Sequence, residues 1–197
     1  MVLVVSNHHN LEEIKSFSRN INEVTVYASA ELKCLGLILD SRLTWKNHIT
    51  NLVKKCYMRI RAIYSVLSYL TSENLKVLGQ SLVLSLIYYM CPVWGLTSQK
   101  NLNLVEKVIR SLARLVLNKR KFDTIAGEIA TDLKWFFPSD LNQYTSLCLM
   151  YKIVTYKIDY FSDYFTPNSL IHPYYTRLRT NLHCTGVPRT NYGTSTF

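Results

Sequence analysis

The sequence predicts an α+β fold that is mainly α, with a small N-terminal β element, a helical bundle and an irregular C-terminal tail. Runs suited to strands are confined to the first forty residues, where β-branched and alternating stretches occur. From about residue 44 to residue 157, apolar residues recur at a spacing of three and four. From Pro167 onward no clear period survives, and three of the five prolines fall there.

Three short strands are expected at the N-terminus, over Val2–Val5, Glu23–Tyr27 and Leu35–Leu39. Three short strands cannot close a sheet alone and leave unpaired edges. The segment 1–43 is therefore expected to be the edge of a larger sheet.

The central helices have recognisable ends. Thr44 is expected to cap a helix that runs to about Tyr69, and Thr71 a second helix that reaches about Met90. Pro92 is expected to end that second helix. Later helical stretches are predicted in the following order: Gln99 to Asn118, a short helix near Gly127, and Ser139 to Lys157.

Positive charge is concentrated in one part of the chain. The formal net charge is +10, yet residues 41–122 hold fourteen basic and two acidic side chains, a net of +12. A concentrated positive field attracts a polyanion such as nucleic acid, whereas a solvated face normally mixes both signs. This charge and the helix pattern delimit a basic helical region, 44–122, followed by connector helices, 123–166, and the tail, 167–197.

The predicted helix from Gln99 carries the most informative polar row. Lys107, Arg110, Arg114 and, if the helix continues, Lys121 lie opposite its apolar stripe, at steps of about 4.5–6 Å. Such steps suit successive phosphates along a strand. The alternative is a solvated face.

The preceding helix shows a related pattern. Lys54 and Arg61 lie opposite the apolar stripe of the helix that begins near Trp45. Tyrosines interleave with these helices, and side chains of this kind stack on bases in some nucleic-acid sites, but a place in the core is the expected one. These tyrosines are Tyr57, Tyr64, Tyr88 and Tyr89.

No catalytic or metal-binding pattern emerges. Polymerases and nucleases use paired carboxylates to hold divalent ions, and no Asp-x-Asp occurs. The five cysteines form no C-x-x-C pair, and His183-Cys184 lacks the spacing of a zinc finger. No cofactor, metal, small-molecule substrate or membrane contact is expected. Scattered cysteines and the lack of a signal peptide favour an intracellular protein, nuclear or cytoplasmic, that is not secreted.

Several motifs then resemble one protein family. The run LKCLGLILDSRLTWKNHI at 32–49 resembles the "LG-lD-s-L-t-W--H" signature of LINE-type, non-LTR, jockey-like retrotransposon reverse transcriptases. YYMCPVWG at 88–95 resembles that family's "Y-sPvWG" segment, and LVEKVIRSLARLV at 104–116 resembles its "lek-Q-r-aLRli" helix. Its C-terminal "Y-tR … RT-yG--sf" box is similar to 175–177, 189–193 and 195–197.

The resemblance implies a C-terminal piece of a polymerase: the last palm strands, a helical thumb and a connector. It implies RNA, DNA or their hybrid as partner, held through phosphates by the thumb. The family's Ala-Asp-Asp box matches no position here, so no catalytic residue is carried over and this chain alone is expected to be no enzyme. Magnesium is expected only for the complete polymerase with its palm and fingers. Both ends are expected to be truncated.

Two functions thus remain open from the sequence. The favoured one is non-specific binding of an RNA or DNA backbone through a basic helical face by a truncated RNA-directed DNA polymerase. The alternative is an inert folded relic or a helical protein–protein interaction module.

Overall fold

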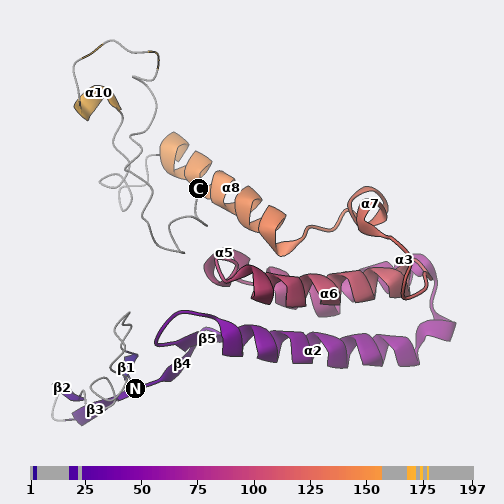
Figure 1. Ribbon diagram of the computed structural model, residues 1–197, viewed down its shortest axis with the longest axis horizontal. Coiled ribbons are helices and arrows are strands. Elements are labelled where there is room, and N and C mark those ends of the chain that lie inside the picture. The colour runs from indigo at the N-terminus through magenta and orange to yellow at the C-terminus, as the bar shows by residue number, and fades with distance from the viewer. Residues whose placement is uncertain are drawn as a thin grey trace. The chain divides into compact units, whose positions relative to one another are not determined.

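The computed structural model describes residues 2–3, 18–21, 24–156, 168–171, 174 and 177. The chain divides into two compact units, Met1–Pro138 and Ser139–Phe197. A few short strands precede a series of helices, which confirms the expected mainly α, α+β class (Figure 1).

The strands form two small sheets in the first unit. Strand β3 (Val24–Ser29) lies between β1 (Val2–Leu3), which is parallel to it, and β2 (Ser18–Ile21), which is antiparallel. A separate hairpin pairs β4 (Glu31–Cys34) with β5 (Leu37–Asp40). Strands β2 and β4 were not expected, and Val4 and Val5 of the first predicted strand lie outside the described residues.

The hairpin turn corrects the strand predicted over Leu35–Leu39. Leu35 and Gly36 form the two-residue connection, with φ angles of 47° and 84°. Positive φ at both central residues is the feature of a type I′ turn, whose twist matches that of the flanking strands. Leu35 therefore belongs to the turn, and the strand begins only at Leu37.

The helical part of the first unit is built on two long helices that run side by side (Figure 1). They are α2 (Lys46–Ser65) and α6 (Gln99–Val116). Between them in sequence come η1 (Leu67–Tyr69), α3 (Ser72–Gly79), the π-helical η2 (Gln80–Leu84), α4 (Ser85–Tyr88) and α5 (Cys91–Trp94). After α6 follow α7 (Ala126–Glu128) and the π-helical η3 (Ile129–Leu133).

The core fills the space between α2, the α3–α4 stretch and α6. Each contributes fully buried apolar side chains at helical spacing: Ile49, Cys56, Val83, Ile87, Val105, Val108, Ile109 and Leu112. Helices α3 and α6 approach closely at Gly79, where an added Cβ would lie 3.2 Å from the Leu112 side chain. The absent side chain of Gly79 is what allows α3 to reach α6.

Several predicted helix ends are corrected. Helix α2 begins after Trp45, whose φ is 62°, and Thr44 is not its N-cap residue. Thr71 does cap α3, because its hydroxyl accepts from the Asn74 N–H at 3.4 Å. Pro92 ends no helix: α4 stops at Tyr88, and Pro92 lies in the first turn of α5, where a missing N–H costs nothing.

The second unit contains α8 (Pro138–Tyr156), which begins at the unit boundary, and the single turn α10 (Asn168–Ile171). Helix α10 falls within the stretch expected to be irregular. Most of the predicted C-terminal box, including 189–193 and 195–197, lies outside the described residues. Among the helices that the structure describes, none combines the length and the apolar character that a membrane span requires.

Candidate nucleic-acid interface

The basic side chains of residues 41–122 fall into two groups. One group is engaged within the fold: Arg59 donates to the Leu82 carbonyl, Lys76 donates to the Asp132 carbonyl at 2.9 Å, and Lys119 pairs with Glu128 at 3.0 Å. The other group is exposed and has no hydrogen bond or ion pair of its side chain within the described part of the chain: Lys46, Lys54, Lys55, Arg61, Lys100, Lys107, Arg120 and Lys121. Only this second group is free to meet an external anion.

On α2, Lys54 and Arg61 lie opposite the buried face, as the sequence pattern predicts. That face is formed by His48, Ile49, Leu52, Cys56 and Ile63. Lys54 and Arg61 are both exposed and seven residues apart, so they project from the same side about 10.5 Å apart along the axis.

The tyrosines of α2 share this exposed side. Tyr57 is 43% exposed and Tyr64 is 66% exposed, so the interpretation of these two rings as core is wrong. They occupy the steps between and after the cations, three and four residues away. We call Lys54, Tyr57, Arg61 and Tyr64 the α2 stripe. The position of these tyrosines opposite the apolar residues is the sequence signal that indicates their exposure.

The other two tyrosines serve the fold. The Tyr88 hydroxyl donates to the Phe136 carbonyl at 3.1 Å and accepts from the Phe136 N–H at 3.0 Å. Burial raises the pKa of Tyr88. The Tyr89 hydroxyl donates to the Leu35 carbonyl at 2.9 Å. Both hydroxyls are thus committed to main-chain partners.

On α6, the predicted basic row is split. Lys107 is exposed and unpartnered among the described residues. Arg110 instead pairs with Glu106 at 2.8 Å, and its guanidinium lies 5.3 Å from the centre of the Phe137 ring. Arg110 therefore already has an anion and an aromatic face beside it.

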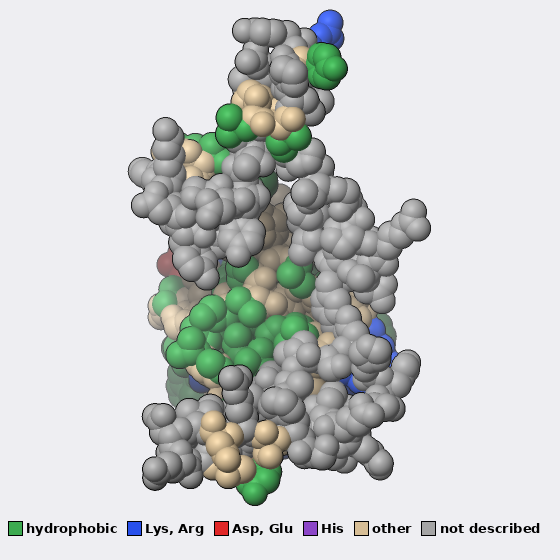
Figure 2. Space-filling model, turned by 90° about the vertical axis from the view of Figure 1, so that its left-hand side faces the viewer, with side chains coloured by type: hydrophobic (Ala, Val, Ile, Leu, Met, Phe, Trp, Pro, Cys, Tyr) green, Lys and Arg blue, Asp and Glu red, His purple; other side chains and the backbone are tan. Residues whose placement is uncertain are grey.

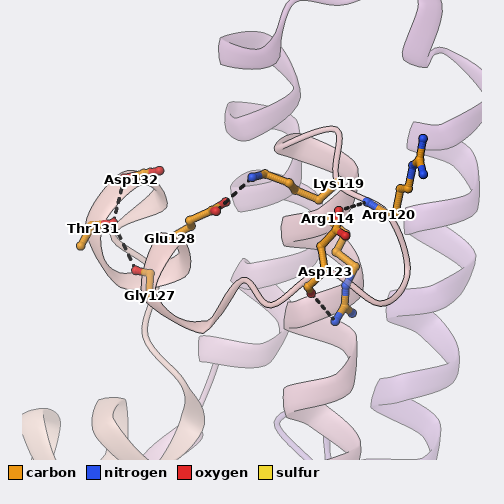
Figure 3. A network of polar contacts seen from close by, with 8 residues as sticks. All are labelled: Arg114, Lys119, Arg120, Asp123, Gly127, Glu128, Thr131 and Asp132. Carbon is orange, nitrogen blue, oxygen red and sulfur yellow. Dashed lines mark hydrogen bonds and ion pairs between the residues drawn. The ribbon is translucent and has the colours of Figure 1, made fainter.

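Arg114 is held by the loop that follows α6 (Figure 3). Its Nη2 donates to the Asp123 carbonyl at 3.4 Å, and its buried Nε has no partner among the described residues. Asp123 also closes the loop, because its carboxylate accepts from the Arg120 N–H at 2.7 Å. Arg114 thus stabilises the loop through its hydrogen bond to the Asp123 carbonyl.

Lys121 does not extend the row on α6. The helix ends at Val116, and Asn118 with a φ of 51° turns the chain away. Lys121 is exposed in the loop, where its ammonium lies 5.6 Å from the centre of the Phe122 ring. The prediction that Lys121 extends the row required the helix to continue to residue 121. The helix ends at Val116, so this condition is not met.

The predicted interface residues therefore belong to different surfaces. Because the buried faces of α2 and α6 pack against each other, Lys54 and Arg61 point away from α6, while Lys107 points away from α2. The structure brings Lys54 and Arg61 together, and it separates them from Lys107. Four further cations of residues 41–122 are exposed and have no hydrogen bond or ion pair of their side chains within the described part of the chain, although they are not among the predicted interface residues: Lys46, Lys55, Lys100 and Arg120.

Three aromatic residues of the motifs at 32–49 and 88–95 form one packed cluster. The His48 ring lies 6.1 Å from Trp45 and 6.2 Å from Trp94, and all three side chains are buried. His48 Nδ1 accepts from the Ile38 N–H at 3.3 Å, and Trp94 Nε1 donates to the Tyr89 carbonyl at 3.0 Å. These residues join the hairpin to the helices, so their role in this chain is structural.

Asp40 organises the junction between β5 and α2. Its carboxylate accepts from the N–H groups of Arg42, Thr44 and Trp45 at 3.1, 3.0 and 2.9 Å, and from the Thr44 hydroxyl at 3.2 Å. The Thr44 carbonyl in turn accepts from the Thr97 hydroxyl at 2.9 Å. A carboxylate with four donors gathered around it is a structural anchor.

Apolar side chains are exposed beside this cluster. Leu35 at the hairpin tip is 72% exposed, Tyr89 is 50% exposed and Val93 on α5 is 44% exposed. Figure 2, which views the molecule from the left-hand side of Figure 1, shows hydrophobic side chains gathered on the described part of this surface. Adjacent exposed apolar side chains suit contact with another surface.

Metal ligands are not grouped in the described part of the chain. Within residues 2–3, 18–21, 24–156, 168–171, 174 and 177, no three His, Cys, Asp or Glu side chains are placed to hold one ion. His183 and Cys184 lie outside these residues.

The described residues define a mainly helical α+β protein in which exposed cations without partners among those residues are concentrated on α2, α6 and the loop after α6. The sequence is 27% identical over 99 residues to a protein of Drosophila melanogaster described as "Probable RNA-directed DNA polymerase from transposon X-element". This similarity covers 49% of this chain and 11% of the relative, so the chain spans about a tenth of that protein's length. It supports a region related to retrotransposon reverse transcriptases.

No protein-family model matches the sequence. No solved structure matches it either.

Proposed function

We propose that this chain is a C-terminal part of a LINE-type, jockey-like retrotransposon reverse transcriptase that binds the RNA or DNA backbone without sequence preference. The observation that carries the proposal is the set of exposed cations, without partners among the described residues, in a mainly helical segment with a net charge of +12. The similarity to a transposon RNA-directed DNA polymerase supports a nucleic-acid partner.

The proposal also assigns a role to each part of the chain. In the proposal, residues 1–43 are the edge of the palm, 44–122 are the thumb and 123–166 are the connector. The thumb holds nucleic acid, while the metal-binding carboxylates and their magnesium belong to a palm outside this chain. No residue here is assigned a catalytic role.

Phosphate binding through free lysines and arginines has a measurable consequence. Each neutralised phosphate releases condensed counterions, so the logarithm of affinity falls linearly with the logarithm of salt concentration. Cations that are already paired in the fold contribute less, because an external phosphate must displace an internal partner. Lys54, Arg61 and Lys107 are therefore stronger candidates than Arg110 or Arg114.

The test is fluorescence anisotropy of the full chain with a labelled RNA–DNA hybrid at several salt concentrations. We expect Lys54→Glu/Arg61→Glu to weaken binding to all sequences alike and to flatten the salt slope by roughly 0.7–0.9 per lost contact. Lys107→Glu reports on the α6 surface separately. Lys33→Glu, an exposed reversal on β4, is the control. If the charge-reversed variants of Lys54, Arg61 and Lys107 all bind with the affinity and salt slope of the wild type, the inert relic is the better description.

A helical protein–protein interaction module is the second candidate function. It rests on a different observation, the exposed Leu35, Tyr89 and Val93 beside the aromatic cluster. In the polymerase context the matching surface is the rest of the palm. Sedimentation of this chain mixed with a separately produced palm and fingers fragment tests it, and Val93→Asp is expected to abolish co-sedimentation. Co-sedimentation that survives Val93→Asp contradicts this second function.

A further inference from the structure

We infer that the α2 stripe is a binding site for unpaired bases, so that this surface prefers single-stranded nucleic acid over duplex. The inference rests on the proposed function, since it names the substrate class of one of its two surfaces. It depends on two aromatic rings and two cations that alternate on one exposed helix face.

The geometry of the stripe comes from helix periodicity. Lys54, Tyr57, Arg61 and Tyr64 follow one another at steps of three, four and three residues, so neighbours are about 4.5–6 Å apart along the axis. Every ring thus has a cation next to it. All four side chains are exposed, and none of them has a hydrogen bond, ion pair or ring contact within the described residues.

The spacing suits a single strand. Tyr57 and Tyr64 are about 10.5 Å apart along the axis, which is about three steps of a stacked strand at roughly 3.4 Å each. A strand that follows the helix can place two bases on the two rings while its phosphates meet Lys54 and Arg61. In a duplex the base faces are already stacked on one another, so only the cations are of use.

Two alternatives fit the stripe less well. An interfacial membrane helix needs large apolar side chains on its outer face. Besides the stripe, the outer face of α2 carries one exposed large aliphatic side chain, Met58, among the exposed polar residues Asn47, Thr50 and Asn51. An acidic protein segment would pair with the cations but has no use for two flat rings. A single strand of nucleic acid uses both kinds of side chain, because its bases stack on the rings regardless of sequence and its phosphates meet the cations.

The helix is also a rigid support. The buried face of α2 packs along α6, and the Arg59 guanidinium is bonded to the Leu82 carbonyl in η2. Aromatic rings on a fixed backbone lose little conformational freedom when they bind, because only two χ angles must be fixed. The stripe therefore has the character of a stacking platform.

The experiment compares three probes of about 20 nucleotides, longer than the usual footprint of one stacking site. They are a mixed-sequence single strand, the duplex formed with its complement, and a strand of equal length with abasic positions. Anisotropy titrations use the full chain and the variants Tyr57→Leu/Tyr64→Leu, Tyr57→Phe/Tyr64→Phe and Lys54→Glu/Arg61→Glu. Tyr69→Leu is the matched control, because Tyr69 is 85% exposed and lies outside the stripe.

We expect the wild type to bind the base-containing strand at least about fivefold more tightly than the abasic strand. The leucine pair should lose that advantage and leave duplex and abasic binding unchanged. The phenylalanine pair should retain it, because stacking needs the ring and not the hydroxyl. The charge-reversed pair should weaken all three probes, and Tyr69→Leu none.

The failures are distinguishable. Equal wild-type affinity for the base-containing and abasic strands overturns the inference without any variant and leaves the proposed backbone binding intact. Duplex affinity that falls in the leucine pair as much as single-strand affinity also overturns it. Absence of salt-dependent binding to every probe removes the proposed function and the inference together.

Discussion

The hydroxyl of Tyr89 donates a hydrogen bond of 2.9 Å to the carbonyl of Leu35, 54 residues earlier in the chain. Leu35 is at the tip of the β4–β5 hairpin, and Tyr89 is the extended residue between α4 and α5. The bond therefore fastens the hairpin to the helices, beside the cluster of Trp45, His48 and Trp94. It explains why two motifs far apart in sequence act as one structural unit.

Removal of this hydroxyl should cost measurable stability. Tyr89→Phe keeps the ring and leaves the Leu35 carbonyl without this donor, so we expect the free energy of unfolding to fall by about 1 kcal/mol. Urea unfolding monitored by tryptophan fluorescence measures it. Tyr57→Phe is the matched control, because the Tyr57 hydroxyl has no partner among the described residues. Equal losses in both variants contradict the assignment.

The hairpin turn offers a substitution that should stabilise the protein. Leu35 has a φ of 47°, a conformation that costs most L-residues roughly 1–2 kcal/mol and that asparagine tolerates better. Its side chain is 72% exposed, so little burial is lost. We expect Leu35→Asn to raise the unfolding midpoint, and Gly36→Ala to lower it because Gly36 has a φ of 84°. A lower midpoint for Leu35→Asn would show that its apolar contacts outweigh the backbone strain.

Stability should fall in mild acid because of His48. Burial, assisted by the positive charge of Lys55, lowers the pKa of His48 below its usual 6.5. The unfolded chain therefore takes up this proton first, so the contribution to stability is complete above pH 6.5 and is lost as the pH falls from there towards the folded pKa. Protonation of Nδ1 also removes the acceptor for the Ile38 N–H.

The measurement is the urea midpoint between pH 7.5 and pH 5 for the wild type and for His48→Asn. The other four histidines are present in both proteins, so the difference in slope reports on His48. We expect the wild type to show the steeper decline. Parallel pH profiles would contradict the prediction.

The cysteines should differ sharply in reactivity. Burial raises the pKa of Cys56 to about 11 and that of Cys91 to about 12, whereas Cys34 is exposed. Only the thiolate reacts rapidly, and it must be accessible. Iodoacetamide at pH 8, followed by peptide mass spectrometry, should modify Cys34 and spare Cys56 and Cys91 until denaturant is added. Rapid native labelling of Cys91 would contradict the packing of α5.

Lys107, Arg110 and Arg114 of α6 should separate into surface and structural positions. Lys107→Glu should change the free energy of unfolding by less than about 0.5 kcal/mol, as exposed substitutions usually do. Arg114→Glu should cost about 1–3 kcal/mol, because a carboxylate would face the Asp123 carbonyl in a partly buried place. Arg110→Glu should cost about 1 kcal/mol through Glu106 and Phe137. Equal changes in the free energy of unfolding at all three positions would instead support a single exposed basic row.

The sequence by itself determined the features that depend on neighbours along the chain. Apolar residues at steps of three and four delimit α2 and α6 to within a few residues, because a helix places such residues on one side whatever it packs against. The exposure of Lys54 and Arg61 followed from the same periodicity. The cap at Thr71 was predictable too, since its hydroxyl meets an N–H only three residues away.

Only the tertiary structure decided the features that depend on distant partners. Strand β2 has no alternating pattern and exists through its pairing with β3, and the start of α2 is set by Asp40 at the end of β5. The sequence pattern predicts Arg114 to be a surface cation, but the chain turns at Asn118 and the Asp123 carbonyl accepts a hydrogen bond from Arg114. Periodicity gives the side of a helix on which a residue lies, but burial depends on whether another segment covers that side. The packing of α2 on α6 thus left the α2 stripe uncovered and directed Lys107 away from it.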